Sequence, residues 1–200
     1  PSLNEMEWVY LNSHLTEAGG QQRRFVVFAA YFTQHLRFLV VRAWHPNGAP
    51  AGTWTGSAWG LLTAAPDGFD LSFLHLGGKD RWTLLKNPDG SARPFCSRLL
   101  ARDDAASFSV DLELIATKPP YEAGGVGHLP FGGHGSFDYY SFSRLEVDGR
   151  LNLTAQSGAV ETVHVQGLGW YDHQWGPFFV TPFRVPGLER IDYLDLNVIP

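Results

Sequence analysis

The feature that most limits the fold of this chain is a series of short alternating apolar segments separated by Gly and Pro. The 200 residues include 22 Gly and 13 Pro, which leaves little room for long helices. In residues 107–114 every second position is apolar, namely Phe108, Val110, Leu112 and Leu114. Strict alternation is typical of a strand with one buried face. The sequence therefore predicts an all-β domain.

Similar segments, or segments rich in β-branched and aromatic residues, predict further strands. We expect strands at residues 7–15, 23–32, 36–44, 53–62, 69–76, 81–86, 107–114, 144–154 and 161–168. Residues 23–44 could form a helix instead, but their β-branched and aromatic content favours strands. Within 144–154, the dipeptide Asp148-Gly149 lies between alternating segments, which predicts a tight hairpin.

This many short antiparallel strands must protect their edges. Closure into a barrel does so, and a barrel of about eight strands leaves room for one small ligand. A two-sheet sandwich is the alternative, and periodicity alone does not choose between them. We expect an antiparallel β-barrel with an apolar cavity. Residues 117–136 are rich in Gly and Pro and predict a long loop that could act as a lid.

The composition narrows the classes of partner. Hydrophobic residues make up 44% of the chain, which indicates a folded domain. The net charge is −5 without a cluster of Lys or Arg, which argues against nucleic acid. No apolar segment is long enough for a membrane helix. No signal peptide is visible, so we expect a cytoplasmic location.

Metal and cofactor motifs are not found in the sequence. Cys96 is the single cysteine, so an internal disulfide and a thiolate zinc site are excluded. The eight His show no metal-binding spacing, and no Gly-rich phosphate loop precedes a helix pattern. We therefore expect no metal and no cofactor.

Residues 167–176, Gly-Leu-Gly-Trp-Tyr-Asp-His-Gln-Trp-Gly, form the strongest candidate site because polar and aromatic groups follow one another without a gap. An extended backbone separates two sets, Trp170, Asp172 and Gln174 on one face and Tyr171, His173 and Trp175 on the other. If the first set faces the cavity, desolvation beside an indole would raise the pKa of Asp172 and make it a general acid. Alternatively, Asp172 and His173 hold a bend at a strand end.

Two further blocks combine aromatic and polar groups. Glu7-Trp8-Val9-Tyr10 opens the first predicted strand, where Glu7 either contacts a ligand or pairs with an arginine at the rim. Tyr139-Tyr140-Ser141 begins another strand. Either tyrosine could present its hydroxyl to the cavity, or pack against a neighbouring strand.

Four blocks resemble the lipocalin-like family that includes carotenoid hydratase (hydroxyneurosporene synthase), the AttH-type proteins assigned as secreted hydrolases, and the decalin-forming Diels–Alderases. The blocks are Glu7-Trp8-x-Tyr10 with His14-Leu15-Thr16, Lys118-Pro119, Tyr139-Tyr140-Ser141 with Arg144-Leu145, and Gly167-x-Gly169-Trp170-x-Asp172-His173-x-Trp175-Gly176. The resemblance implies a calyx-like barrel with an apolar cavity, normally followed by a second barrel.

In the hydratase branch, the resemblance implies that Asp172 protonates a terminal C=C. That branch has Tyr where this chain has Trp170, and the Tyr-Tyr-Ser block is closer to the hydrolase-like and Diels–Alderase branches. We expect a barrel domain at residues 1–180, followed by an extension or the start of a second barrel at 181–200. A second barrel or another copy of the chain could complete the cavity.

Three functions compete. The first is a cofactor-free cyclase, similar to a Diels–Alderase, that acts on a polyunsaturated hydrophobic natural-product intermediate of the polyketide kind. The second is a hydratase of an isoprenoid or polyene C=C with Asp172 as general acid, and the third is a non-catalytic carrier. We expect an enzyme, with Asp172, Tyr140 and Trp170 catalytic. The expected substrate contacts are Glu7, Trp8, Tyr10, Tyr139, Ser141, His173, Gln174 and Trp175.

Overall fold

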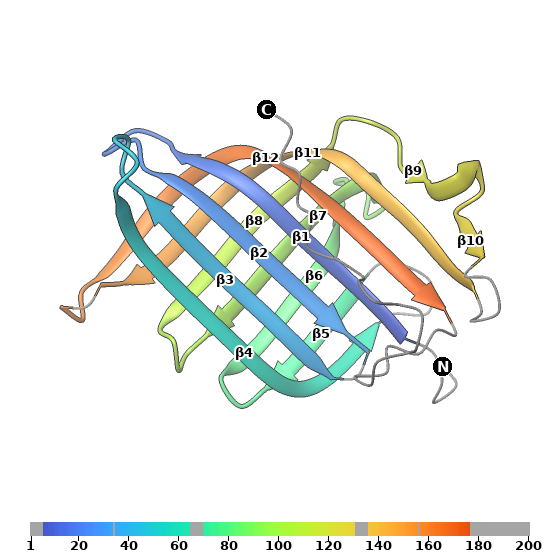
Figure 1. Cartoon of the computed structure of the whole chain (residues 1–200), viewed down its shortest axis with the longest axis horizontal. Helices are drawn as coiled ribbons and strands as arrows, with labels where there is room; N and C mark the ends of the chain where they lie inside the picture. Colours follow the sequence, from blue (N-terminus) through green and yellow to red (C-terminus); the bar gives the residue numbers. More distant parts are fainter. Residues whose placement is uncertain (1–5, 34, 65–69, 131–135, 156, 177–200) are drawn as a thin grey trace, which may run out of the picture.

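The computed structural model describes residues 6–33, 35–64, 70–130, 136–155 and 157–176. Within them the chain is almost entirely β-structure (Figure 1). The elements are β1 Met6–Glu17, β2 Arg24–Phe32, β3 Leu36–Trp44, β4 Pro50–Ala64, β5 Asp70–His75, β6 Gly78–Lys86, β7 Ala92–Asp103, β8 Phe108–Ala116, β9 Tyr121–Glu122, η1 Ala123–Gly125, β10 His128–Pro130, β11 Ser136–Thr154 and β12 Val160–Gly176.

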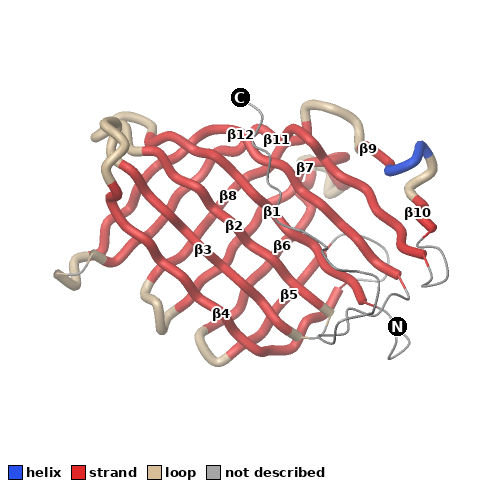
Figure 2. The backbone as a smooth tube through the Cα atoms, in the orientation of Figure 1, coloured by secondary structure: helices blue, strands red, loops and turns tan. Residues whose placement is uncertain are grey.

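Ten of these strands close into one antiparallel barrel (Figures 1 and 2). β11 pairs with β12, and β12 pairs with β1. The strands β1 to β8 then pair consecutively, and β8 closes the barrel by pairing with β11. The short strands β9 and β10 pair with the first half of β11, ahead of the part that pairs with β8. The predicted all-β barrel is confirmed, and the two-sheet sandwich is excluded.

Alternate residues of each strand point into the barrel and form its core. Fully buried examples are Leu11, Val27, Leu39, Leu112 and Val165. Burying a side chain of this kind contributes about 1.5–3 kcal/mol to stability. Tyr31 meets Phe73 and Trp82 edge to face, with ring centroids 5.8 and 6.2 Å away. This aromatic layer fills part of the interior and bounds the cavity described below.

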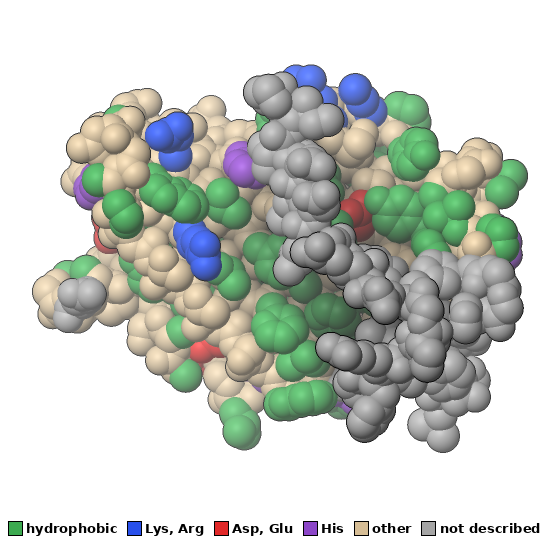
Figure 3. Space-filling view, in the orientation of Figure 1, with side chains coloured by type: hydrophobic (Ala, Val, Ile, Leu, Met, Phe, Trp, Pro, Cys, Tyr) green, Lys and Arg blue, Asp and Glu red, His purple; other side chains and the backbone are tan. Residues whose placement is uncertain are grey.

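The outer face of β1–β4 also carries many apolar side chains, with few charged ones between them (Figure 3). Phe28, Phe32 and Phe38 lie on this face and are half-buried. Phe32 packs against Phe38 and Trp8, with ring centroids 6.0 and 6.2 Å away. These strands therefore have apolar side chains on both faces, toward the core and on an aromatic outer surface.

A buried ion cluster joins β2, β3, β5, β6 and β7. The fully buried Arg37 guanidinium lies 3.4 Å from a carboxylate oxygen of Asp80 and 3.1 Å from one of Asp103. The Tyr31 hydroxyl donates to Asp80 at 3.0 Å. His75 Nδ1 accepts the Gly77 N–H at 3.1 Å, and His75 Nε2 lies 3.5 Å from Asp80 and 3.3 Å from the Arg37 guanidinium. Removing one partner from such a group leaves an uncompensated buried charge.

The hairpin predicted at Asp148-Gly149 is wrong. β11 runs through both residues without a turn, and Gly149 pairs with Val165 on one side and Leu112 on the other. A Cβ on Gly149 would collide with the backbone carbonyl of Asp111. Glycine is required here because neighbouring backbones approach closely, which is a second use of Gly inside strands.

Other element boundaries also differ from prediction. β7 was not predicted, and β12 continues from the predicted 161–168 to Gly176. The predicted loop 117–136 contains β9, η1 and β10, while residues 131–135 and the predicted extension 181–200 lie outside the described residues. Within the described ranges, no helix has the length and apolarity needed to cross a membrane.

Candidate functional site

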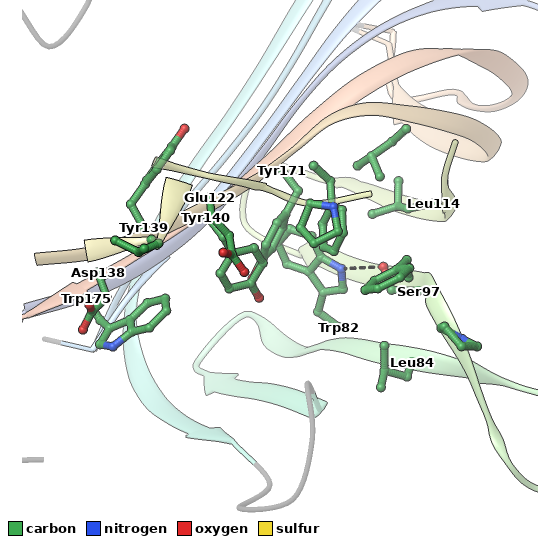
Figure 4. A pocket seen from close by; sticks show the side chains of 17 residues that line it. Trp82, Leu84, Ser97, Leu114, Glu122, Asp138, Tyr139, Tyr140, Tyr171 and Trp175 are labelled. Atoms are coloured by element: carbon green, nitrogen blue, oxygen red, sulfur yellow. Dashed lines mark hydrogen bonds between the residues drawn. The ribbon is translucent and has the colours of Figure 1, made fainter. Parts of the chain in front are cut away.

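A cavity of about 520 Å³ lies between β6, β7, β11, β12 and the segment 120–127. Figure 4 shows Trp82, Tyr140, Tyr171 and Glu122 converging on it. Its described lining is mainly apolar and aromatic: Trp82, Leu84, Pro94, Phe95, Ser97, Leu114, Pro120, Glu122, Val126, Gly127, Asp138, Tyr139, Tyr140, Phe142, Leu145, Tyr171 and Trp175. A cavity of this size suits one drug-sized organic molecule.

The deeper part of the cavity is aromatic. Trp82 and Tyr171, both buried, meet edge to face there with centroids 5.2 Å apart. Nearer the solvent, the half-exposed Phe95 lies 5.3 Å from Phe142. The Trp82 indole N–H donates to the Ser97 hydroxyl at 3.2 Å (Figure 4). Because the indole hydrogen is already paired there, the ring offers an apolar face to a ligand. The segment 117–130 supplies Pro120, Glu122, Val126 and Gly127 as one wall.

A chain of four polar groups borders this aromatic cavity. His173 Nε2 lies 2.7 Å from Glu7 Oε1, and His173 Nδ1 lies 3.2 Å from Tyr140 Oη. Tyr140 Oη lies 3.4 Å from Tyr171 Oη. The Glu7–His173–Tyr140–Tyr171 chain, called the polar chain below, extends from a half-exposed carboxylate to a buried phenol. Groups in this order would allow a proton to pass between the solvent side and the cavity.

The environment fixes the ionisation of three members of the polar chain. The hydrogen bond with His173 holds the pKa of Glu7 below its usual range, against the opposing effect of burial. Burial raises the pKa of Tyr140, and it raises the pKa of Tyr171 far more. At neutral pH Glu7 is therefore a carboxylate, and both phenols keep their protons and can donate hydrogen bonds.

Strand register explains why residues from distant parts of the sequence meet here. β1, β12 and β11 are neighbours, and Glu7 pairs with Trp175, while His173 pairs with Tyr140. Directly paired residues project to the same face of a sheet. Three of the four motif blocks therefore form adjacent strands, and the fourth, Lys118-Pro119, precedes the wall segment.

Asp172 lies on the opposite face of β12 from the cavity. Tyr171 and Trp175 line the cavity, so the alternating positions Trp170, Asp172 and Gln174 point to the outer face. The condition under which Asp172 would act on a cavity ligand is therefore not met. The position of Asp172 therefore does not support a role in this cavity, and the catalytic role implied by the resemblance stays a prediction.

Asp172 is nevertheless buried, at 4% exposure. Its Oδ1 accepts the Tyr139 hydroxyl at 2.7 Å, joining β12 to β11. Burial and the Asp172 carboxylate raise the pKa values of Tyr10 and Tyr139, so both phenols stay protonated as donors. The carboxylate braces three adjacent strands, β11, β12 and β1. Asn12, Ser141 and Gln174 are buried polar neighbours on the same outer face.

The expected site residues thus divide between the two faces. Glu7, Tyr140 and His173 belong to the polar chain, and Trp175 and Tyr139 line the cavity, although the Tyr139 hydroxyl is directed to Asp172. The remaining expected residues are on the outer face: Trp8, Tyr10, Ser141, Trp170, Asp172 and Gln174. Among these, Trp170 stacks on His14 with centroids 6.4 Å apart.

Several lining residues were missed by the sequence analysis. Tyr171 could have been found, because the inward positions Val163 and Val165 continue by steps of two through Gly167 and Gly169 to Tyr171. Trp82 and Phe142 carry no local signal that separates a lining residue from a core residue. Within the described residues, no three His, Cys, Asp or Glu side chains are grouped to hold a metal ion.

No family model matches the sequence, and no curated protein matches it. Several solved structures resemble it, two examples being an AttH-type protein and a hydratase. One is an AttH-type protein from Nitrosomonas europaea, with a TM-score of 0.58 and 20% identity over 88% of this chain and 53% of the other. The second is kievitone hydratase from Nectria haematococca, with a TM-score of 0.56 and 17% identity over 84% of this chain and 47% of the other.

This chain spans about half the length of both proteins. At 17–20% sequence identity the similarity shows a shared fold alone. It agrees with the fold implied by the four motif blocks. The chain has the lipocalin-like β-barrel fold that the AttH-type protein and the hydratase share.

Proposed function

We propose that this barrel is an enzyme that adds water to a C=C of an apolar unsaturated molecule bound in the cavity. The observation that carries the proposal is the polar chain at the edge of an aromatic cavity. Hydration of an alkene needs a proton donor, a water molecule and a dry aromatic surround. The polar chain supplies the first, and the half-exposed end at Glu7 gives access to solvent.

Tyr140 is the proton donor in this proposal, since it lines the cavity and Glu7 and His173 do not. The carboxylate of Glu7 accepts the hydrogen on His173 Nε2. When the His173 ring is cationic, Nδ1–H donates to Tyr140 Oη and leaves the phenol proton free to act on the ligand. When the ring is neutral, Nδ1 instead accepts from Tyr140. The imidazole can therefore both restore and remove the Tyr140 proton.

In this proposal hydration takes place in two steps, protonation of the alkene and addition of water. The Tyr140 proton bonds to one alkene carbon, the π bond breaks, and positive charge develops on the other carbon. The electron-rich faces of the nearby rings, among them Trp175 at 6.0 Å from the Tyr140 ring, stabilise that charge. A water oxygen bonds to the cationic carbon, and its surplus proton returns to the Tyr140 phenolate directly or through His173.

The similarity to kievitone hydratase supports hydration only through the shared fold. A second candidate is the cyclase, a Diels–Alderase-like enzyme acting on a polyunsaturated intermediate. The neutral Tyr140 hydroxyl at an apolar wall favours it, because such a donor can polarise a carbonyl while the cavity holds the reacting ends together.

Solvent deuterium separates the two candidates. Isoprenoid alcohols and conjugated polyene ketones would be incubated with the protein in D₂O, and products analysed by mass spectrometry and NMR. Hydration predicts a product with one carbon-bound deuteron at the alkene. A cyclised product without carbon-bound deuterium would establish the cyclase instead. Saturable binding with the ligand recovered unchanged across the panel would indicate a carrier and contradict both.

We further propose that a second copy of the chain or a second barrel domain packs on the aromatic outer face of β1–β4. The half-buried Phe28, Phe32 and Phe38 support this proposal, as does the length of the two similar structures. Analytical ultracentrifugation tests the second copy. A monomer at all concentrations would contradict self-association and leave the domain as the partner.

A further inference from the structure

The described lining of the cavity contains acidic side chains but no Lys or Arg. Glu122 and Asp138 line it directly, and Glu7 lies next to it through His173. Arg93 and Lys118 are close in sequence to lining residues, yet neither is among the residues that line the cavity. A ligand in this cavity therefore meets negative charge with no compensating cation on the described walls.

Strand pairing places these carboxylates around aromatic rings. Glu122 of β9 pairs directly with Tyr140 of β11, so both side chains project to the cavity face. Asp138 pairs with Trp175, and Trp175 pairs on its other side with Glu7. Figure 4 shows Asp138 close to Trp175, and Glu122 close to Tyr140. Each of the two rings thus has at least one carboxylate as its direct neighbour.

The rings themselves favour positive charge. Trp175 lies with its ring centroid 6.0 Å from that of Tyr140 and 4.6 Å from that of His173. The faces of such rings attract cations, most strongly when water is partly excluded. His128 Nδ1 is hydrogen-bonded to Asp138 at 2.8 Å, but His128 itself is not among the residues that line the cavity. The carboxylates and the aromatic rings therefore both favour a cationic ligand.

We propose that the cavity selects ligands by charge, binding apolar molecules with a protonated or quaternary amine end and excluding those that end in carboxylate, sulfate or phosphate. Glu122 and Asp138 determine this specificity. The inference deepens the proposed function because it concerns the same cavity, but it concerns binding and needs no turnover. A substrate of the proposed hydratase would accordingly be an unsaturated amine or a neutral molecule, and not an acid or a phosphate ester.

Displacement of a neutral fluorescent probe, N-phenyl-1-naphthylamine, tests the selectivity. The competitors are decyltrimethylammonium, decanol and decanoate, which share one chain length. The two ionic competitors are kept below their critical micelle concentrations and decanol below its solubility limit, in low salt at pH 8. We expect the ammonium to displace the probe at a concentration at least ~10-fold below that of decanoate, with decanol between them. Equal displacement by all three, or a preference for decanoate, would overturn the proposal.

Matched variants test whether Glu122 and Asp138 cause the charge selectivity. Glu122→Gln with Asp138→Asn should bring the ammonium-to-decanoate ratio close to one and leave decanol displacement unchanged. Glu113→Gln with Glu146→Gln removes the same charge from exposed positions on β8 and β11 and should leave the ratio as in the wild type. If the control pair lowers the ratio equally, the net charge of −5 is the cause and the cavity assignment fails. Absence of hydration with an intact ratio would contradict the proposed function alone.

Discussion

Glu7 and His173 are 166 residues apart in sequence, yet Glu7 Oε1 and His173 Nε2 lie 2.7 Å apart. The contact joins β1 to β12, the strands that bring the two ends of the described chain together in the barrel. It also orients the imidazole, because the Glu7 carboxylate accepts the Nε2 hydrogen and leaves Nδ1 facing Tyr140. One contact therefore joins the two strands and orients the imidazole toward Tyr140.

Replacing Glu7 by Gln should change how stability depends on pH. The pKa of Glu7 is lowered from 4.5 in the folded chain, mainly by its hydrogen bond with His173. The folded state therefore gains stability from Glu7 above pH 4.5, and loses it as pH falls through the lower folded pKa. Thermal unfolding from pH 3 to 7 should show a smaller acid-dependent loss in Glu7→Gln. A pH profile identical to that of the wild type would contradict the ion pair, and Glu113→Gln serves as an exposed control.

Replacing Asp172 by Asn should weaken the fold and spare the chemistry. The Tyr139 hydroxyl loses a charged acceptor, so we expect unfolding free energy to fall by about 1.5–3 kcal/mol in urea denaturation. Because the carboxylate no longer raises the pKa values of Tyr10 and Tyr139, their ionisation in an alkaline absorbance titration should move to lower pH. A stable Asp172→Asn protein with turnover lowered by ~100-fold would restore Asp172 as the acid.

Replacing Gly149 by Val should disrupt the middle of β11. The added side chain would collide with the backbone of Asp111 and Leu112 on β8, where the barrel closes. We expect a loss of unfolding free energy above about 2 kcal/mol, comparable with other changes that overpack a core. Arg150→Val introduces the same side chain at the exposed neighbouring position and should change stability by less than about 0.5 kcal/mol. Equal effects in the two variants would show that the close strand approach is unimportant.

Replacing Arg37 by Met should lower the free energy of unfolding more than replacing an exposed arginine does. The substitution leaves Asp80 and Asp103 buried without their cation, at a cost of about 3–5 kcal/mol in the free energy of unfolding. Arg102→Met breaks an exposed pair with Asp104 and should cost about 0–1 kcal/mol. The two variants would be compared by guanidinium denaturation. A similar, small cost for both would contradict the role of the cluster in holding β3, β6 and β7 together.

The fold could be predicted from the sequence where apolar residues alternated or where β-branched and aromatic residues were concentrated. The predicted strands at 23–32 and 36–44 agree with β2 and β3 almost residue for residue. β7 was missed because Pro94 breaks its pattern and Phe95 has a positive φ of 58°, which interrupts the alternation at its start. The hairpin prediction at Gly149 was wrong because glycine is required both in tight turns and where the backbones of two strands approach closely.

The site was harder to predict because both faces of β12 mix polar and aromatic groups. Alternation separated Asp172 from His173 correctly, but it could not show which face was inward. The four motif blocks indicated the fold, and the acid they suggested lies on the outer surface. Glu122 and Asp138 reach the cavity only through pairing of β9, β11 and β12, which no local pattern encodes.

The most direct test of the account is the rate at which Tyr140→Phe forms carbon-deuterated hydration product in D₂O. The substitution keeps the ring and removes only the hydroxyl that links His173 to the cavity. We predict a fall of at least ~100-fold, as expected for loss of a general acid, with Tyr121→Phe on the exposed part of β9 unchanged. Wild-type turnover in Tyr140→Phe would contradict the account.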